Sequence, residues 1–404
     1  MSAASAPLKG VRVLDLTNVL AGPFCCHQLA HLGAEVIKIE VPGRGDLARQ
    51  LGADAELNRA GMGVSFLAQN AGKSSLTLNL KAAEGQGLFR KLAAKSDVVV
   101  ENFRPGVMER LGLSAETLRA DNPALIYCAI SGFGQDGPLS KAPAYDQIVQ
   151  GMSGVMSITG DGESAPLRAG YPIADTIGGL TAAMAISAAL AGRDAHGQGT
   201  VIDVSMLEAV VATMGWVVSN YLIAGVTPHP QGNENATSAP SGLFRTADGA
   251  MNIAANKQEQ FETLAGLIER ADLLDDPRFA TREDRKTNRL LLRKEIEKRL
   301  AERPTSDWVR ALTEAGVPVG PVLSVPDVLA HPQIADRGLL AEYNDVPDVD
   351  RPVRTVRTAA RFDGKVPSVD SGPPALGADT SRLLEELLGL GAEDQARLRQ
   401  EGII

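Results

Sequence analysis

The chain has 404 residues and a formal net charge of −9, with 44% hydrophobic and 22% charged residues. This length exceeds one ordinary hydrophobic core and predicts two domains. The acidic balance argues against nucleic acid or an anionic membrane as a partner, because either would need a concentrated basic face.

The N-terminal segment and the cysteines indicate a cellular compartment. The segment MSAASAPLKG lacks the apolar core of a signal peptide, and no later apolar run reaches ~18 residues without polar interruption. Cys25 and Cys26 are adjacent and Cys128 is distant, a spacing that suits neither a disulfide framework nor a metal site. We therefore expect a cytoplasmic protein with no membrane segment.

The first hundred and thirty residues alternate strands with helices. VRVLDLT predicts a strand, GPFCCHQLAHLG a short helix that begins near Pro23 and ends near Gly33, and EVIKIE a second strand. SSLTLNL, a helix over 81–95, DVVVENF, a helix around 106–120 and ALIYCAISGFG continue the pattern. The alternation predicts an α/β fold with a doubly wound parallel sheet. Ligands of such sheets bind at the carboxyl ends of the strands, which here are Thr17 to Ala21, Glu40, Asn102 to Arg104 and Ser131 to Gly134.

The remaining chain predicts a further domain. An apolar helix over 176–192 is followed by a strand and one long, mostly buried helix in TVIDVSMLEAVVATMGWVVSNYLIAG. A polar linker over 227–241 then leads to a hairpin with its turn at Asp248-Gly249. Charged helices over 258–270, 282–302 and 305–315 and an amphipathic helix near 380–389 complete the chain.

Several common site motifs are absent from the sequence. It contains no GxGxxG after the first strand, no GxxxxGK[ST] and no HExxH, so we expect no nicotinamide site, no ATP site and no zinc or other metal site. His27 and His31 are spaced i,i+4 on one helix, but no third ligand is placed to complete a metal site. We interpret them as a structural pair.

Four stretches carry a family resemblance: DLTNVLAGPFCCHQLAHLGAEVIKIE, NAGKSSLTLNLK, ENFRPGVMERLGL and ISGFGQDGP. In this order and spacing, they resemble the class III CoA-transferase family. The resemblance implies a large Rossmann-like, CoA-binding domain built from both chain ends, a smaller inserted α/β domain, and two chains interlocked as a homodimer. The corresponding boundaries are 1–200 for the first part of the large domain, 201–226 for a linker helix, 227–330 for the small domain and 331–404 for the return.

Asp175, in LRAGYPIADTIGGL, matches the nucleophile of that family. A carboxylate can attack an acyl-CoA and pass through an anhydride to an enzyme-bound CoA thioester. Taken alone, an aspartate before TIGGLTAAMAI is more often a helix N-cap. The two interpretations are compatible, because a helix N-terminus also stabilises oxyanions.

The neighbouring residues Tyr145 and Asp146 are also predicted at the catalytic site. Racemases of the family carry a histidine where this chain has Tyr145, and a phenol is a poor base near neutral pH, so the resemblance favours a transferase. Asp146 matches an acidic active-site position, where it would orient Tyr145 or the acceptor. The alternative for Asp146 is a solvated loop carboxylate.

For CoA, the resemblance implies contacts from both apolar and basic residues. The predicted contacts are Asn18, Val19, Ala21, Lys73, Asn102, Phe103, Arg104 and Arg110, of which Lys73, Arg104 and Arg110 would pair with phosphates. Two positions depart from the family, because Leu20 stands where some transferases have Gln and Val41 where some have a phosphate-binding Arg. Arg44 is a candidate replacement for that cation.

The expected reaction is transfer of CoA from succinyl-CoA or another small acyl-CoA to a free carboxylic acid, favoured to be a dicarboxylate. Arg168, Arg44 and Arg104 on crevice segments are candidate partners for a second carboxylate. The segment QGNENATSAPSG lacks the glycines of the lid in formyl-CoA transferases, so oxalate specificity is not supported. Alternatives are an isomerase of the same family, acting by intramolecular transfer or racemisation, and a non-catalytic CoA-binding protein.

Overall fold

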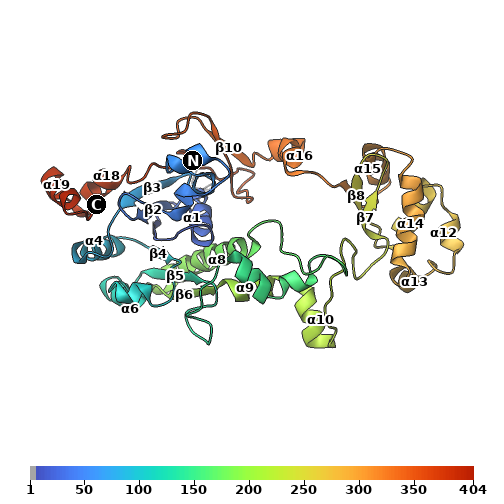
Figure 1. Ribbon diagram of the computed structural model, residues 1–404, viewed down its shortest axis with the longest axis horizontal. Helices are drawn as coiled ribbons and strands as arrows, with labels where there is room; N and C mark the ends of the chain where they lie inside the picture. The colour runs from blue at the N-terminus through green and yellow to red at the C-terminus, as the bar shows by residue number, and fades with distance from the viewer. Residues whose placement is uncertain (1–5) are drawn as a thin grey trace. The chain divides into compact units, whose positions relative to one another are not determined.

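A computed structural model describes residues 6–404, without the side chains of residues 194–196 (Figure 1). The chain divides into two compact units. Unit 1 contains the residues up to 155, 168–226 and 332–404, and unit 2 contains 156–167 and 227–331. The segment 156–167 therefore groups with the later part of the chain, a feature that the predicted boundaries lack.

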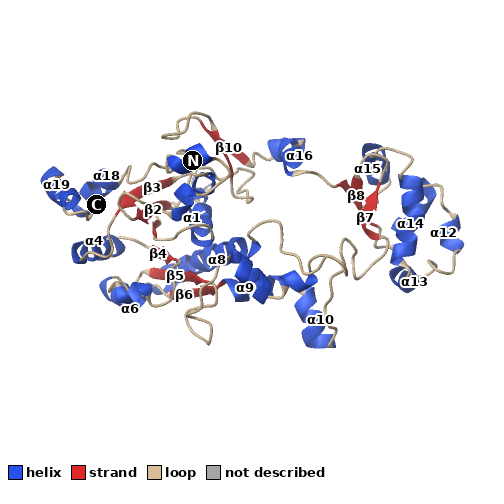
Figure 2. Ribbon diagram, in the orientation of Figure 1, coloured by secondary structure: helices blue, strands red, loops and turns tan. Residues whose placement is uncertain are grey.

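Unit 1 is built on a six-stranded sheet with the order β3-β2-β1-β4-β5-β6 (Figure 2). All five neighbouring pairs are parallel, so the predicted doubly wound parallel sheet is confirmed. The order reverses between β1 and β4, which is the place where ligands bind in such sheets. The strands are β1 (Arg12–Asp15), β2 (Glu35–Glu40), β3 (Lys73–Thr77), β4 (Val98–Glu101), β5 (Ile126–Ser131) and β6 (Val201–Ser205).

Apolar residues point alternately to the two faces of this sheet, because side chains alternate along a strand. Val13 belongs to a core with α1 and α8, whereas Leu14 belongs to a core with α4, α6 and the C-terminal helices. The first face is covered by α1 (Ala21–His31), α8 (Ile173–His196) and α9 (Met206–Thr213). The second is covered by α4 (Ala83–Ala93), α6 (Ala115–Asp121), α18 (Thr380–Leu388) and α19 (Ala392–Gln400).

Helix α8 is the longest helix and packs on α1, α9, β5 and β6. By length and composition alone, Ile173–Arg193 could span a membrane, but one such helix is also typical of a protein core. Near its C-terminal end, Arg193 pairs with Asp97 at 2.8 Å. Gly179 allows close contact with α1, because a Cβ there would lie 2.5 Å from the carbonyl oxygen of Ala21.

The prediction of one long, mostly buried helix after β6 is wrong. The helix ends at Thr213, Gly215 adopts φ 51° and ψ −112°, and α10 (Trp216–Ala224) continues at 79° to α9. None of the residues of α10 is buried. The segment 201–226 is thus a strand of the central sheet and two helices, and not a single linker helix.

Unit 2 contains a three-stranded antiparallel sheet, β7-β8-β9. Strands β7 (Ser241–Arg245) and β8 (Ala250–Ala254) form the predicted hairpin, with β9 (Val319–Pro321) beside β8. The predicted helix over 282–302 is divided at Asn288, whose side-chain amide donates to the carbonyl oxygens of Arg278 and Asp284. The helices are α11 (Gln258–Leu267), α12 (Asp272–Asp275), α13 (Arg282–Thr287), α14 (Arg289–Leu300), α15 (Thr305–Glu314) and α16 (Val325–Ala330).

Shorter elements complete unit 1. They are η2 (Leu47–Gln50), α2 (Ala55–Arg59), α3 (Val64–Leu67), α5 (Val107–Arg110), α7 (Asp146–Met152), η3 (Val155–Ile158, which crosses into unit 2), α17 (Pro332–Asp336), β10 (Leu340–Tyr343) and β11 (Val353–Val356).

Candidate active site

A pocket of about 180 Å³ lies at the carboxyl ends of β1, β4 and β5, beside the point where the strand order reverses. The turns after β1 and β4 are joined there. The Asn18 amide N–H donates to Asn102 Oδ1, the Asn102 Nδ2 donates to the Asn18 carbonyl oxygen, and both distances are 2.8 Å. The pocket is lined by residues of unit 1 alone, namely Asn18, Val19, Leu20, Ala21, Asn102, Phe103, Ile130, Ser131, Gly132, Ala144, Tyr145, Asp175 and Met206.

Asp175 is the ionisable residue of this lining with a raised pKa. It is the third residue of α8, so it lies in the first turn and is not the N-cap, a position that Pro172 occupies. Burial, and then the negative charge of Asp146, raise the pKa of Asp175 to about 7. Near neutral pH, its carboxyl group therefore exists in both protonation states, and its carboxylate form is more basic than an ordinary aspartate.

Asp146 holds the start of α8. Its Oδ1 accepts hydrogen bonds from the backbone N–H groups of Ala174, at 2.8 Å, and Asp175, at 3.4 Å. Its Oδ2 accepts a hydrogen bond from Gln150 Nε2 at 2.7 Å. Asp146 is buried, so the alternative of a solvated loop carboxylate is wrong. It caps the helix that carries Asp175, and among the described residues no side-chain hydrogen bond joins Asp146 to Tyr145.

Tyr145 stands at the rim of the pocket. It is the N-cap residue of α7, and it is 71% exposed although it lines the pocket. Gly132 lets this segment approach the end of β5, because a Cβ at Gly132 would lie 2.2 Å from the Cβ of Ala144. The phenol is therefore free to meet a ligand that enters the pocket.

Five of the eight predicted CoA contacts line the pocket: Asn18, Val19, Ala21, Asn102 and Phe103. Arg104 and Arg110 are exposed on the segment after β4, outside this lining.

The predicted phosphate contact by Lys73 is wrong in this structure. Its ammonium is buried, lies 2.8 Å from Asp15 Oδ2 and donates to the carbonyl oxygen of Pro23 at 3.0 Å. With those partners, Lys73 neutralises Asp15 and does not offer a free cation.

Met206 and Ala144 line the pocket but were not predicted. Met206 directly follows β6, so the rule that placed Ser131 at the sheet edge would have found it as well. Ala144 carries no chemical signal in the sequence, and its place depends on the tertiary approach of the 133–145 loop to Gly132.

His27 and His31 form the structural pair that their spacing predicts. Their ring centroids are 4.2 Å apart, and each ring lies within hydrogen-bond distance of a backbone carbonyl oxygen. Burial, and then the neighbouring His31 and Lys73, lower the pKa of His27 to about 3. Among the described residues, no cluster of three or more potential metal ligands occurs.

The chain is similar to known proteins over nearly its whole length. Residues 8–380 match the sequence pattern of CoA-transferase family III. The chain is 37% identical to succinyl-CoA:glutarate CoA-transferase of Mus musculus, over 98% of this chain and 90% of that protein. It is 40% identical to acetyl-CoA:oxalate CoA-transferase of Acetobacter aceti, over 86% of this chain and 89% of that protein.

A solved structure agrees with the fold. The crystal structure of a CAIB/BAIF family protein from Brucella suis superposes with a TM-score of 0.84 at 36% identity, and the match covers 95% of this chain and all of that one. The parallel sheet and the sequence pattern together define an enzyme that processes acyl-CoA. The chain belongs to CoA-transferase family III and is a class III CoA-transferase.

Proposed function

We propose that Asp175 is the nucleophile that carries CoA between two acids. The observation that carries this proposal is its half-buried carboxyl group in the pocket at the strand ends, with the pKa raised to about 7. A more basic carboxylate is a stronger nucleophile, and about half of the molecules hold it ionised near neutral pH.

The reaction proceeds in two symmetric halves. A carboxylate oxygen of Asp175 attacks the thioester carbonyl carbon of the donor, the C–S bond breaks, CoA leaves as a thiolate and a mixed anhydride forms. The thiolate then attacks the Asp175 carbonyl carbon, which releases the donor's acid as a carboxylate and leaves an aspartyl-CoA thioester. The acceptor carboxylate attacks this thioester, and the released thiolate attacks the acceptor's carbonyl carbon in the new anhydride. The products are a new acyl-CoA and free Asp175.

The position of Asp175 in the first turn of α8 supports this sequence. Each step creates an oxyanion or a thiolate, and the peptide dipoles at a helix N-terminus stabilise negative charge. Tyr145 at the rim contributes a hydroxyl group that donates to the same oxyanions. The CoA moiety lies against Asn18, Val19, Ala21, Asn102 and Phe103, with Arg104 and Arg110 beyond the pocket for its phosphates.

For the substrates, we propose succinyl-CoA or another small acyl-CoA as donor and a dicarboxylate as acceptor. Glutarate and oxalate, named for the two relatives, are both dicarboxylates, whereas the named donors differ. Arg168 is exposed and precedes α8 by a few residues, so it is a candidate partner for the second carboxylate of the acceptor.

We further propose that the protein works as a homodimer in the cytoplasm. Helix α10 carries large apolar side chains without a buried residue, and Trp216, Leu222 and Ile223 are 79%, 74% and 86% exposed. Soluble proteins rarely leave a patch of this kind in water. A second copy of the chain is the occupant that the family resemblance implies.

The test is mass spectrometry of CoA products. The wild type, Asp175→Asn and Asp121→Asn are incubated with succinyl-CoA and a panel of mono- and dicarboxylic acids in deuterated water. Asp121 is an exposed aspartate paired with Arg90 at 2.8 Å on the other face of the sheet, and serves as a control. New thioesters in the wild type and the control, but not in Asp175→Asn, support the proposal. Full retention of exchange by Asp175→Asn overturns it, and deuterium uptake without exchange would identify a racemase.

A further inference from the structure

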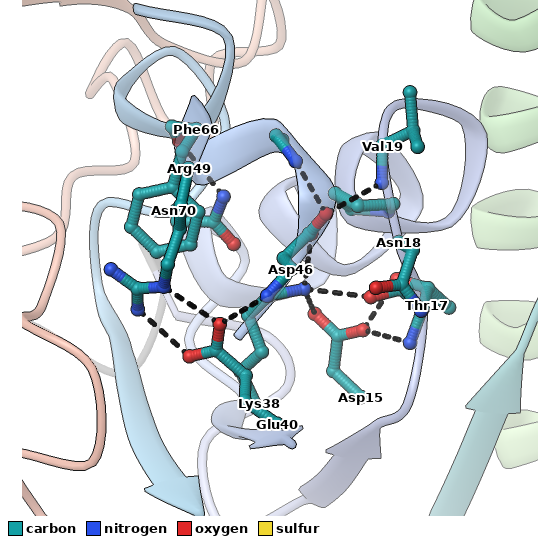
Figure 3. A network of polar contacts seen from close by, with 12 residues as sticks. Asp15, Thr17, Asn18, Val19, Lys38, Glu40, Asp46, Arg49, Phe66 and Asn70 are labelled. Atoms are coloured by element: carbon teal, nitrogen blue, oxygen red, sulfur yellow. Dashed lines mark hydrogen bonds and ion pairs between the residues drawn. The ribbon is translucent and has the colours of Figure 1, made fainter. Parts of the chain in front are cut away.

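The turn that follows β1 has its backbone polar groups held by side chains (Figure 3). The Thr17 N–H donates to Asp15 Oδ1 at 2.9 Å, and the Thr17 carbonyl oxygen accepts from Lys38 Nζ at 2.8 Å. Asn102 holds both polar groups of Asn18, and the Val19 N–H donates to Asp46 Oδ1 at 3.0 Å. A turn with so many partners is specified in conformation as well as in position.

Val19 is held in a conformation that its side chain disfavours. Its φ is 68°, in the left-handed region, where a β-branched residue is an outlier. Such backbone strain persists only where the surroundings over-determine it, and it clusters at functional sites. Val19 lines the pocket that holds Asp175, so the strained residue is part of the proposed binding surface.

The acceptor of the Val19 N–H belongs to a buried ion pair. Asp46 Oδ2 lies 2.9 Å from Lys38 Nζ, and the two side chains are 1% and 0% exposed. Burial alone would lower the pKa of Lys38, but the carboxylates of Asp15, Asp46 and Glu40 outweigh burial and raise it. Lys38 therefore stays charged, and one ammonium joins Asp46 to the carbonyl oxygen of Thr17.

Neither residue of this pair touches the pocket, and a buried ion pair is weak evidence for a gain in stability. Its contacts with Thr17 and Val19 suggest another reason for its place. We propose that Lys38 and Asp46 are positioning residues, which lock Val19 in the left-handed conformation and so shape the pocket wall that receives CoA. This inference rests on the proposed function.

The first experiment separates the hydrogen-bond acceptor from the charge. Lys38→Gln/Asp46→Asn removes both charges but keeps an acceptor for the Val19 N–H and a donor for the Thr17 carbonyl. Lys38→Gln/Asp46→Leu removes the same charges and the acceptor, with a side chain of similar shape. Calorimetric titration with CoA should give a Kd within about threefold of the wild type for the first variant and at least about tenfold weaker for the second, a difference of ~1.4 kcal/mol. Equal affinities in the two would overturn the proposal.

The second experiment changes Val19 itself, first with the buried ions left intact. Val19→Gly allows a positive φ without a steric penalty, whereas Val19→Pro fixes φ near −65°. Both variants remove the valine side chain from the pocket lining, so they are compared with each other: we expect Val19→Gly to bind CoA at least about tenfold more tightly than Val19→Pro. In the Val19→Gly background, Asp46→Leu should weaken binding less than it does with Val19. Equal affinity of Val19→Gly and Val19→Pro for CoA overturns the inference.

Hydrogen exchange separates this inference from the proposed function. If the wild type itself fails to bind CoA, the proposed function is wrong, and hydrogen exchange in a peptide over 16–24 still tests whether Asp46 holds the turn after β1. Loss of protection there in the variant with Asp46→Leu, but not in the variant with Asp46→Asn, supports the inference. Equal protection in both contradicts it.

Discussion

At the scale of single residues, Asp175 and Asp146 lie at the same helix end but differ in the hydrogen bonds of their carboxyl groups. Asp146 accepts three hydrogen bonds from N–H groups, two from the backbone of α8 and one from Gln150. In the described part of the chain, no hydrogen bond to the Asp175 carboxylate is recorded. Its ionised form is therefore costly, which agrees with its raised pKa.

Replacing Asp146 should shift the pH dependence of the reaction. Asp146→Asn removes a negative charge but keeps an acceptor oxygen for the start of α8, so the pKa of Asp175 falls from about 7 towards its ordinary value. The ascending limb of the pH–rate profile for aspartyl-CoA formation should move to lower pH. The shift is partial, because burial is the larger cause. A limb that stays in place or moves to higher pH would contradict this account.

Replacing Asp175 should stabilise the fold above neutral pH. Its folded-state pKa of about 7 exceeds the ordinary 3.8, so ionisation costs folding free energy as pH rises between these values. Asp175→Asn should leave stability unchanged near pH 3.8 and raise it above pH 7, by up to ~4 kcal/mol before solvent at the pocket mouth reduces the effect. Urea unfolding at both pH values measures the difference. Asp121→Asn should lack this gain.

At the scale of elements, the contact between α1 and α8 depends on glycine. A Cβ at Gly179 would meet the backbone carbonyl oxygen of Ala21 at 2.5 Å, whereas one at Gly178 would meet the flexible side chain of Met206 at 2.8 Å. Gly179→Ala should therefore destabilise unit 1 by ~1–3 kcal/mol, and Gly178→Ala by clearly less. Thermal unfolding of the two variants makes the comparison. Equal losses would show that the Gly179 contact relaxes easily.

The buried histidine pair of α1 should make the fold acid-sensitive. The folded-state pKa of His27 is about 3, whereas the ordinary value is 6.5, so His27 is neutral in the folded protein near neutral pH. The unfolded chain therefore binds protons first, and stability should be complete above pH 6.5 and decline as pH falls towards 3. Urea unfolding of wild type and His27→Gln over this range should show a shallower decline in the variant. Parallel curves would contradict the assignment.

The sequence predicts the strands of the parallel sheet well because their signals are local, although the single helix expected around 106–120 is divided into α5 and α6. The β-rich runs such as VRVLDLT and EVIKIE, which alternate with helices, predicted a parallel sheet, and the rule that ligands bind at the strand ends placed Asn18 and Asn102 at the same crevice. Two failures concern tertiary structure. No local pattern showed that Lys73 would form an ion pair with Asp15. No local pattern showed that Gly215 would adopt a backbone conformation that ends α9. The ion pair depends on a residue that is distant in the chain. The end of α9 depends on the surroundings of an apolar helix.

At the scale of the whole molecule, the apolar side chains of α10 predict self-association. Ile223→Lys and Trp216→Glu place charges on this exposed helix, so they should convert the proposed dimer into monomers at micromolar concentration. Leu47→Lys is the control, because Leu47 is 40% exposed on η2. Light scattering after size-exclusion chromatography measures the mass. A dimer that survives both α10 variants would place the interface elsewhere.

Helix α8 spans about 36 Å at 1.5 Å per residue, and it is anchored at both ends. Asp146 holds its first turn, and Arg193 near its last turn pairs with Asp97 beside β4. Asp146 lies at the positive end of the helix dipole and Arg193 at the negative end, so each charge interacts favourably with the dipole. Asp175 therefore belongs to a helix that is held in place at both ends. In the proposed reaction, the approach between this carboxylate and a thioester would then come from movement of the substrate or of the pocket rim.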